Sequence, residues 1–346
     1  MRRNGETYEV KLPKEDHPLP SENYHLSKMR LESLLRRLKS KPEVLKHYDE
    51  VVKKQLERNI IEPVNWTEQT EVGKVHYSPH REIIRLDKDT TKLRVVYDAS
   101  AKHHGPSLHS GPPLTPMIID LMTRFRANKV ALTADIEKAF LNIAIAPEHR
   151  DFLRFFWVKD ILTGNPKVLI MRFTRVVFGV NSSPFLLNGT IRHHLNKYMD
   201  RDLEFVEEAL RSIYVDDLAS SKPNVPSAYD FYSKLRKRFV ESFNMCKWLT
   251  NDQEELANRI KSAEEGQVAI QHHPPPDLQQ EDKTFSETQF QNVDNSEGLP
   301  KVLGTSWNPI KDKLVFTFKS LTSYLTEEIV TKRIVLSSIA KIFEPL

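Results

Sequence analysis

Residues 1–62 predict two amphipathic helices, because apolar side chains recur there every three or four positions. The apolar stripe of the first helix consists of Leu31, Leu34, Leu35 and Leu38. Segment 40–43, Ser-Lys-Pro-Glu, has the pattern of a capping box and predicts the start of the second helix. The stripe of that helix consists of Leu45, Tyr48, Val52 and Leu56. We therefore expect a helical lead-in ahead of the main fold.

Strand-like and helix-like patterns alternate between residues 63 and 250. A short apolar run at 130–134 predicts a buried strand that delivers Asp135 at its end. Pro184 marks the start of a helix. Its apolar stripe consists of Leu187, Ile191, Leu195 and Tyr198. A later helix is predicted from Phe231, Leu235 and Phe239, and a returning strand begins at Lys247, Trp248 and Leu249. This mixture favours an α+β fold.

Segment 251–300 differs in composition from the rest of the chain. It contains three Lys or Arg residues, eleven Asp or Glu residues and the run His-Pro-Pro-Pro at 273–276. Few apolar residues interrupt it, which is typical of a flexible insertion. The neighbouring His272 and His273 have no spaced partner ligands, so we interpret them as loop residues rather than as a metal site.

Charge changes the picture once that segment is set aside. The whole chain has a net charge of +4, but outside 251–300 there are 48 Lys or Arg against 36 Asp or Glu, a net of +12. An excess of this size suits a cleft that follows a phosphate backbone. Because a basic balance is common in other proteins too, it permits nucleic-acid binding without demonstrating it.

Composition excludes several classes of protein. The chain has 346 residues, 39% of them hydrophobic, and a mean hydropathy of −0.50, as expected of a soluble protein without a membrane span. Cys246 is the single cysteine, which excludes an internal disulfide and a cysteine-rich zinc site. No apolar run follows the charged start at Arg2 and Arg3, so we expect no secretory signal and a reducing compartment.

The candidate chemistry lies in segment 214–217, Tyr-Val-Asp-Asp, together with Asp135. The pattern of segment 214–217 predicts a tight turn that carries two adjacent carboxylates, Asp216 and Asp217. Phosphoryl transfer builds charge on the attacking and leaving oxygens, and two hard cations about 4 Å apart stabilise that charge. Magnesium prefers oxygen ligands, and manganese accepts the same ones. The three aspartates therefore predict a two-metal site.

Both parts of this pattern have a plainer interpretation. An Asp-Asp turn is stable without a cation if both carboxylates are solvated. Asp135 also suits a helix N-cap, because the Glu-Lys-Ala at 137–139 would continue well as a helix.

Four segments together resemble a reverse transcriptase, in order and in spacing. They are Leu-Arg-Val-Val-Tyr-Asp-Ala-Ser at 93–100, Ala-Asp-Ile-Glu-Lys-Ala-Phe at 134–140, Phe-Gly-Val-Asn-Ser-Ser-Pro-Phe at 178–185 and Tyr-Val-Asp-Asp at 214–217. Within that family the chain is most similar to the BEL/Pao group of LTR retrotransposons. The resemblance covers most of the chain, from about Tyr8 to its last residue.

The resemblance implies roles for residues around the acids. Asp135, Asp216 and Asp217 would hold two Mg²⁺ ions, and the Ile136 backbone carbonyl would complete one coordination shell. Phe140 would be a steric gate that excludes a ribose 2′-hydroxyl by clash. Its alternative role is plain core packing, because its neighbours are apolar as well.

Further residues would contact the nucleotide or the primer. Arg94, with Lys88 or Lys92, would contact the triphosphate, although basic residues on a hairpin at 85–98 can also be merely solvated. Phe178 stands where retroviral enzymes commonly have Gln, and Gly179 suits a loop that comes close to a ligand.

Segment 301–307, which contains Leu303 and Gly304, resembles the primer-grip hairpin; an ordinary edge hairpin is the alternative.

The resemblance implies an α+β right-hand polymerase with fingers at roughly 60–134 and 150–185, and a palm whose antiparallel sheet carries the aspartates. We expect a helical lead-in at 1–62, fingers and palm at 63–250, the flexible insertion at 251–300, and a primer-grip-like hairpin with the start of a thumb at 301–346. Segment 331–346 resembles only the beginning of a thumb, as in a piece of a retrotransposon polyprotein.

The expected function is RNA-directed DNA polymerase, with an RNA or DNA template, a primer and deoxynucleoside triphosphates as partners. The expected location is the cytoplasm or virus-like particles, with later access to the nucleus. One alternative is a degenerate or repurposed fragment that binds nucleic acid or is inert. The other is an RNA-dependent RNA polymerase, against which Phe140 argues because that enzyme must admit the 2′-hydroxyl.

Overall fold

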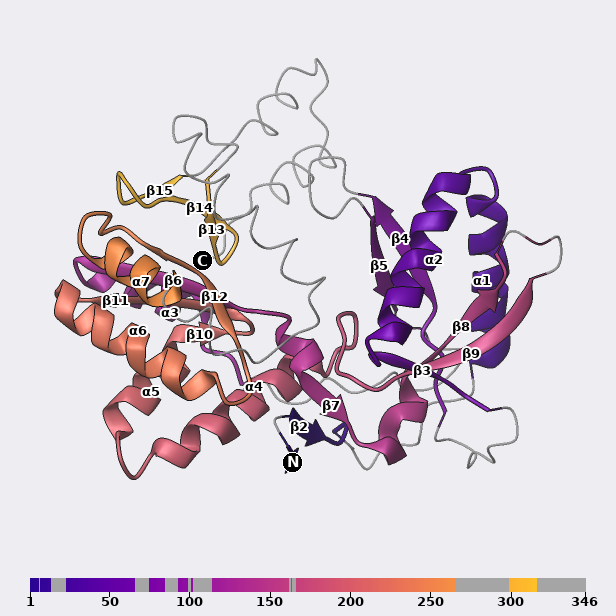
Figure 1. Cartoon of the computed structure of the whole chain (residues 1–346), viewed down its shortest axis with the longest axis horizontal. Coiled ribbons are helices and arrows are strands. Elements are labelled where there is room, and N and C mark those ends of the chain that lie inside the picture. The colour runs from indigo at the N-terminus through magenta and orange to yellow at the C-terminus, as the bar shows by residue number, and fades with distance from the viewer. Residues whose placement is uncertain are drawn as a thin grey trace, which may run out of the picture. The chain divides into compact units, whose positions relative to one another are not determined.

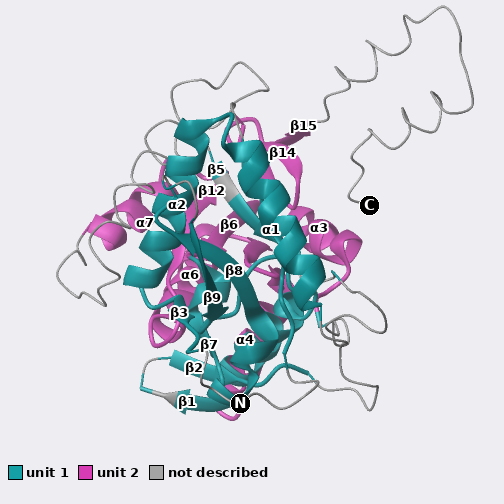
Figure 2. Ribbon diagram, turned by 90° about the vertical axis from the view of Figure 1, so that its right-hand side faces the viewer, with its two compact units in different colours: residues 1–114, 138–194 teal, residues 115–137, 195–346 magenta. Residues whose placement is uncertain are grey.

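A computed structural model of the chain describes residues 1–5, 7–13, 23–65, 75–84, 93–98, 101, 114–161, 163, 166–265 and 299–315. The chain forms two compact units (Figures 1 and 2). Unit 1 combines residues 1–114 with 138–194, and unit 2 combines 115–137 with 195–346. Across the described residues, every helix is too short or too polar to cross a membrane.

Unit 1 contains three small sheets and three α-helices among its described residues. The helices and 3₁₀ turns are α1 (Tyr24–Leu38), α2 (Pro42–Glu57), η1 (Ala139–Asn142), η2 (Pro147–Leu153) and α4 (Ser183–Leu195). The strands are β1 (Arg2–Asn4), β2 (Thr7–Val10), β3 (Ile61–Pro63), β4 (His80–Ile84), β5 (Leu93–Tyr97), β7 (Ile143–Ile145), β8 (Arg154–Lys159) and β9 (Lys167–Phe173). Their sheets have the orders β1-β2-β7, β3-β9-β8 and β4-β5.

Aromatic side chains form the core of unit 1. The Trp157 ring stacks on Tyr48 of α2 with 4.8 Å between centroids, and Phe156 stacks on Tyr77 at 4.7 Å. Trp157 also donates its indole N–H to the Asp49 carboxylate at 3.0 Å. Such aromatic pairs contribute beyond the area that they bury. The two predicted N-terminal helices are therefore confirmed, and α2 is fixed to strand β8 by its apolar face.

The predicted capping box is wrong. Lys41 is the N-cap residue of α2, with no side-chain cap hydrogen bond, and the Ser40 hydroxyl instead donates to the Arg37 carbonyl at 2.8 Å. Pro42 begins the helix and supplies no N–H that would need a cap. Ser40 therefore serves the end of α1 rather than the start of α2.

Unit 2 is built on an antiparallel four-stranded sheet of order β10-β11-β6-β12. Its strands are β6 (Val130–Ile136), β10 (Ile213–Tyr214), β11 (Asp217–Lys222) and β12 (Met245–Thr250). Its helices are α3 (Ile118–Ala127), η3 (Asn196–Tyr198), α5 (Leu203–Ser212), α6 (Val225–Phe239) and α7 (Leu256–Glu265). A second sheet of order β13-β14-β15 consists of Lys301–Val302, Thr305–Asn308 and Lys313–Val315.

The β13–β15 sheet is fastened to α3. Trp307 is fully buried and meets Phe125 edge to face, with 5.2 Å between ring centroids. Arg126 forms an ion pair with Asp312, which also accepts the Trp307 indole N–H at 3.1 Å. The hairpin at 301–307 is thus part of a shared core with α3, strand β6 and strand β11, and not a free edge.

Three predictions about organisation need correction. Residues 256–265 form helix α7, within the segment expected to be flexible, because Leu256 and Ile260 lie one turn apart and are buried. Residues 115–134 belong to the same unit as the aspartate-bearing sheet, whereas the sequence assigned them to the fingers. Helix α4 ends at Leu195, so Tyr198 lies beyond it in η3. The predicted thumb start at 331–346 and residues 266–298 of the insertion lie outside the described residues.

Candidate functional site

Asp135 and Asp217 face each other on neighbouring strands of the unit 2 sheet. In the antiparallel register, Asp217 at the start of β11 pairs with Asp135 near the end of β6. The Ile136 N–H donates to the Asp216 carbonyl at 2.9 Å, so the facing aspartates are a pair of the non-hydrogen-bonded kind. Side chains lie closest together in such pairs. The register therefore brings two of the three predicted aspartates together and places the third beside them.

The turn that carries Asp216 is strained. Tyr214 pairs with Asp217, so Val215 and Asp216 form a two-residue hairpin turn. Val215 has φ 56°, a left-handed conformation that β-branched residues rarely adopt. Strain of this kind clusters at functional sites. The predicted tight turn is confirmed, although the chain enters it from helix α5 through a strand of only two residues.

The neighbouring carboxylates perturb one another. Desolvation by the surrounding protein, and then the charges of Asp216 and Asp135, raise the pKa of the Asp217 carboxyl to about 7. Desolvation and the charge of Asp135 also raise the pKa of Asp216. Solvent still reaches the Asp217 side chain, so the repulsion between carboxylates is the contribution that a bound cation would relieve.

Lys247 supplies a cation to this cluster. Its ammonium Nζ lies 2.8 Å from Oδ2 of Asp135. Strand β12 pairs Cys246 with Asp135 and Leu249 with Thr133, so three steps along β12 match two steps along β6. The extra residue is a bulge, and Lys247 within it has φ 54°. Sequence reasoning missed this role, because Lys247 had been assigned only to the start of a returning strand.

The donor set suits a hard divalent cation, but the side chains do not yet converge on one. Carboxylate oxygens of Asp135, Asp216 and Asp217 are the ligands that Mg²⁺ or Mn²⁺ takes. Across the described ranges, however, no group of three His, Cys, Asp or Glu side chains is gathered closely enough to hold a metal ion. One carboxylate oxygen of Asp135 contacts Lys247 instead.

A pocket of about 140 Å³ opens beside the facing aspartates. Asp135, Asp217, Lys247 and Leu303 are among the residues that line it. Leu303 and Gly304 form the two-residue turn between β13 and β14, with φ 49° and 90°. Positive φ at both positions is the geometry of a hairpin turn whose twist matches its strands. The structure thus places part of the predicted primer-grip hairpin at the same pocket as two predicted metal ligands.

Phe140 and Phe178 lie together in unit 1. Phe140, in η1, is 3% exposed, whereas Phe178 is 66% exposed. Gly179 has φ 90°, and a Cβ there would lie 2.1 Å from the Tyr97 carbonyl oxygen. Glycine is therefore required here by the backbone and by the Tyr97 carbonyl, whereas the sequence prediction gave the approach of a ligand as the reason. The interpretation of Asp135 as a helix N-cap is wrong, because Asp135 lies within β6 and Lys138 caps η1.

The predicted phosphate-binding side chains are only partly described. Strands β4 and β5 pair antiparallel, with Arg94 opposite Ile83, so the first strand lies ahead of the range 85–98 in which the sequence placed the hairpin. Nothing is described of the Arg94 side chain, and Lys88 and Lys92 lie outside the described residues.

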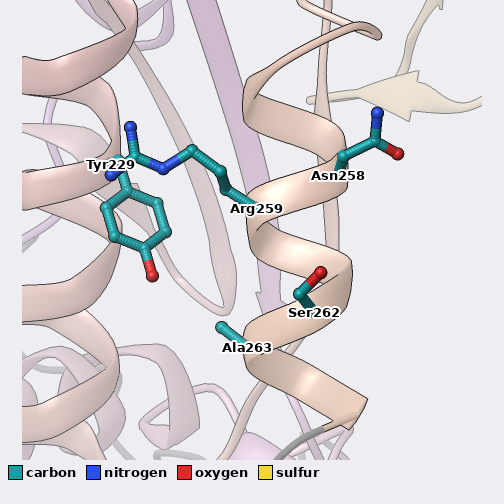
Figure 3. A pocket seen from close by; sticks show the side chains of 5 residues that line it. All are labelled: Tyr229, Asn258, Arg259, Ser262 and Ala263. Carbon is teal, nitrogen blue, oxygen red and sulfur yellow. The ribbon is translucent and has the colours of Figure 1, made fainter.

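A second hollow, of about 420 Å³, lies between α6 and α7 (Figure 3). The Arg259 guanidinium lies over the Tyr229 ring, 3.9 Å from its centroid, and both side chains point toward each other in Figure 3. None of the predicted site residues lines this hollow. The contact ties helix α7 to α6 and needs no ligand to explain it.

Comparison with known proteins gave similar structures only. No protein-family model matches the chain, and no curated protein matches it. A prototype foamy virus protease-reverse transcriptase (CSH mutant) is 19% identical, with a TM-score of 0.43, and the match covers 59% of this chain and 23% of that one. A foamy viral protease-reverse transcriptase dRH in complex with double-stranded DNA is 19% identical, with a TM-score of 0.38, covering 57% and 29%. The matched part spans less than a third of either protein, and a likeness at these scores carries no argument about activity.

Proposed function

We propose that this chain is an RNA-directed DNA polymerase that adds deoxynucleotides to a primer 3′-hydroxyl. The observation that carries the proposal is the register pairing of Asp135 with Asp217, with Asp216 in the strained turn beside them. Carboxylates on adjacent antiparallel strands, at an accessible pocket, are what nucleotidyl transfer requires for two hard cations.

Asp135, Asp216 and Asp217 would hold the two Mg²⁺ ions, with Mn²⁺ as an alternative. The Ile136 carbonyl is a further candidate ligand. The ions would supply charge stabilisation for the attacking and leaving oxygens. The chain's own part is to hold the three carboxylates, and the pKa of Asp217 is raised first by desolvation and then by the charges of Asp216 and Asp135 that a cation would offset.

Phe140, Phe178 and Gly179 would form the nucleotide-facing part of unit 1. A buried ring supported by a second ring is stiff, and a stiff wall is what exclusion of a 2′-hydroxyl requires. Arg94 with Lys88 or Lys92 would neutralise the triphosphate. An RNA polymerase would need space at Phe140, which is why we favour deoxynucleotides.

The turn at Leu303 and Gly304 would position the primer terminus. Leu303 lines the pocket that Asp135 and Asp217 also line, so a primer end placed there would lie beside the carboxylates. The excess of basic residues outside 251–300 would bind the template and primer backbones. By its sequence motifs we place the chain in the BEL/Pao group of retrotransposons, with its work in the cytoplasm or virus-like particles and later nuclear access.

The test is primer extension on an RNA template with deoxynucleotides and Mg²⁺, with Asp216→Asn as the paired variant. We expect extension by the natural chain and none above background by the variant, with equal template binding by both. Equal extension by the two proteins would overturn the assignment of the aspartates. If the chain shows no primer extension, the same assay is run on a longer chain extended past Leu346. Absence of extension by the longer chain as well would favour a fragment that is inert or that only binds nucleic acid.

A further inference from the structure

The aspartate cluster must be neutralised when no metal is bound. Asp135, Asp216 and Asp217 lie at one end of the sheet, and desolvation, followed by the charge of neighbouring carboxylates, raises the pKa of the last two. The cation that lies among them in this structure is the Lys247 ammonium, 2.8 Å from Asp135. The charge of the same ammonium lowers the pKa of Asp217, and it lowers that of Asp216 together with a backbone hydrogen bond.

Lys247 reaches this place through a special backbone conformation. Without the bulge in β12, successive side chains would alternate regularly between the two faces of the sheet. The inserted residue and its φ of 54° redirect the lysine toward Asp135. A left-handed lysine is strained, because its Cβ approaches the backbone. The fold maintains this strain at a position that contacts a candidate metal ligand.

The ion pair differs from the surface pairs of unit 2. The side chains of Lys247 and Asp135 are 33% and 28% exposed, whereas Lys261 and Glu265 on α7 are 73% and 69% exposed. Partial burial weakens solvent screening, so the first pair interacts more strongly. Other charged groups around the pocket are Asp217 from β11 and Lys301 from the hairpin, and Lys301 is itself exposed.

We propose that Lys247 is the resting counter-ion of the aspartate cluster and that a divalent cation must displace its ammonium from Asp135 in order to bind. This inference rests on the metal-binding part of the proposed function. It accounts for the finding that the three donor side chains, within the described residues, do not converge while Lys247 is in place. The divalent cation then takes the place of the Lys247 ammonium, so the negative charge of the aspartates is balanced by a cation in both states.

The test is Mn²⁺ binding to the full chain, followed by the spin-resonance signal of free Mn²⁺, without nucleotide or nucleic acid. Lys247→Met keeps the length of the stem and removes the charge. We expect the variant to bind Mn²⁺ at least threefold more tightly, to melt at a lower temperature without metal, and to gain more melting temperature from saturating Mn²⁺ than the natural chain gains. Lys261→Met, the same change at an exposed pair in the same unit, should alter none of these quantities.

A double-variant cycle isolates the contact. In the Asp135→Asn background, Lys247→Met should raise Mn²⁺ affinity by less than it does in the natural chain, because the direct pair is already broken and only the longer-range effect of the ammonium on Asp216 and Asp217 is left. Unchanged or weaker binding by Lys247→Met alone overturns the counter-ion role. Absence of Mn²⁺ binding by the natural chain and by Lys247→Met overturns the metal site itself, and with it the proposed function.

Discussion

The rings of Phe140 and Phe178 meet edge to face, with 4.4 Å between centroids and 84° between planes. Phe178 is 66% exposed, yet the turn at Gly179 fixes its backbone against Tyr97. An exposed ring held against a buried one can act as its support, because edge-to-face pairs are favourable contacts.

Removing either ring should relax the choice of sugar. Phe140→Ala should raise ribonucleotide incorporation relative to deoxynucleotide by roughly 10-fold or more. Phe178→Ala should raise relative ribonucleotide incorporation less, by about 2-fold to 10-fold. This is the change in rate that corresponds to the free energy of one aromatic pair. The measurement is the ratio of kcat/KM values for matched ribo- and deoxynucleotides, with Phe178→Tyr as the ring-retaining control. Unchanged sugar selectivity in Phe140→Ala would show that Phe140 has only a role in core packing.

Gly179 and Gly189 offer a matched pair of substitutions. Gly179→Ala should destabilise unit 1 by about 1–3 kcal/mol, because it combines a φ of 90° with a Cβ that would lie 2.1 Å from the Tyr97 oxygen. Gly189→Ala should instead stabilise it by up to about 1 kcal/mol, because helix α4 gains a better helix former and the nearest side-chain atom is 3.8 Å away. Urea unfolding at one pH compares the two, and similar effects of both changes would contradict the geometry.

Val215 should carry strain that can be relieved. Val215→Asn should raise the free energy of unfolding by about 0.5–1 kcal/mol, because Asn tolerates a left-handed conformation far better than a β-branched residue does. Val215→Ile keeps the β-branch and should show no gain. If the strain shapes the aspartate turn, Val215→Asn should also lower primer extension. A destabilised Val215→Asn protein would show that side-chain packing outweighs the backbone effect.

Two histidines, the buried His76 and the half-buried His80, should make unit 1 sensitive to acid. Burial lowers the pKa of His76 to about 4 and that of His80 to about 4, from 6.5 in each case. His76 is 1% exposed, and neither ring nitrogen has a partner within the described residues. Between pH 6.5 and pH 4 these histidines bind a proton in the unfolded chain but not in the folded chain. The free energy of unfolding is therefore unaffected by them above pH 6.5 and decreases as the pH falls toward 4.

Through His76 alone, the free energy of unfolding should decrease by roughly 3 kcal/mol once the pH is below the pKa of this residue in both the folded and the unfolded chain. Urea midpoints between pH 7.5 and pH 4.5 would measure it. His76→Leu should make the urea midpoint depend less on pH, because a leucine side chain cannot bind a proton. An identical slope in the variant would assign the acid sensitivity to other groups.

The sequence predicted the parts of the site that depend on local pattern. An apolar run and a turn signal suffice to place Asp135 on a strand and Asp216 in a tight turn. The order of the motifs predicted one antiparallel sheet that carries the aspartates, but the register that pairs Asp135 with Asp217 depends on tertiary contacts and was not predicted.

The parts that were missed depend on longer-range geometry. The bulge at Lys247 leaves no signal in a strand that is otherwise regular, and only pairing with β6 reveals it. Helix α7 was hidden by the acidic, Gln-rich composition of the residues that follow it, which outweighed the spacing of Leu256 and Ile260. The division of units was missed because residues 115–137 pack with segments more than sixty positions later in the chain.

The anchoring of Trp307 and Asp312 on α3 has a consequence for how the protein folds. Residues 301–315 pack on helix α3, which lies at 118–127, so their contacts close a very long loop of chain. Contacts of such wide sequence separation form late, because the entropy of loop closure must be overcome first. The wall of the pocket that Leu303 supplies would then be among the last parts to assemble. A nascent or partly folded chain would hold its aspartates in register before this wall of the pocket beside them had formed.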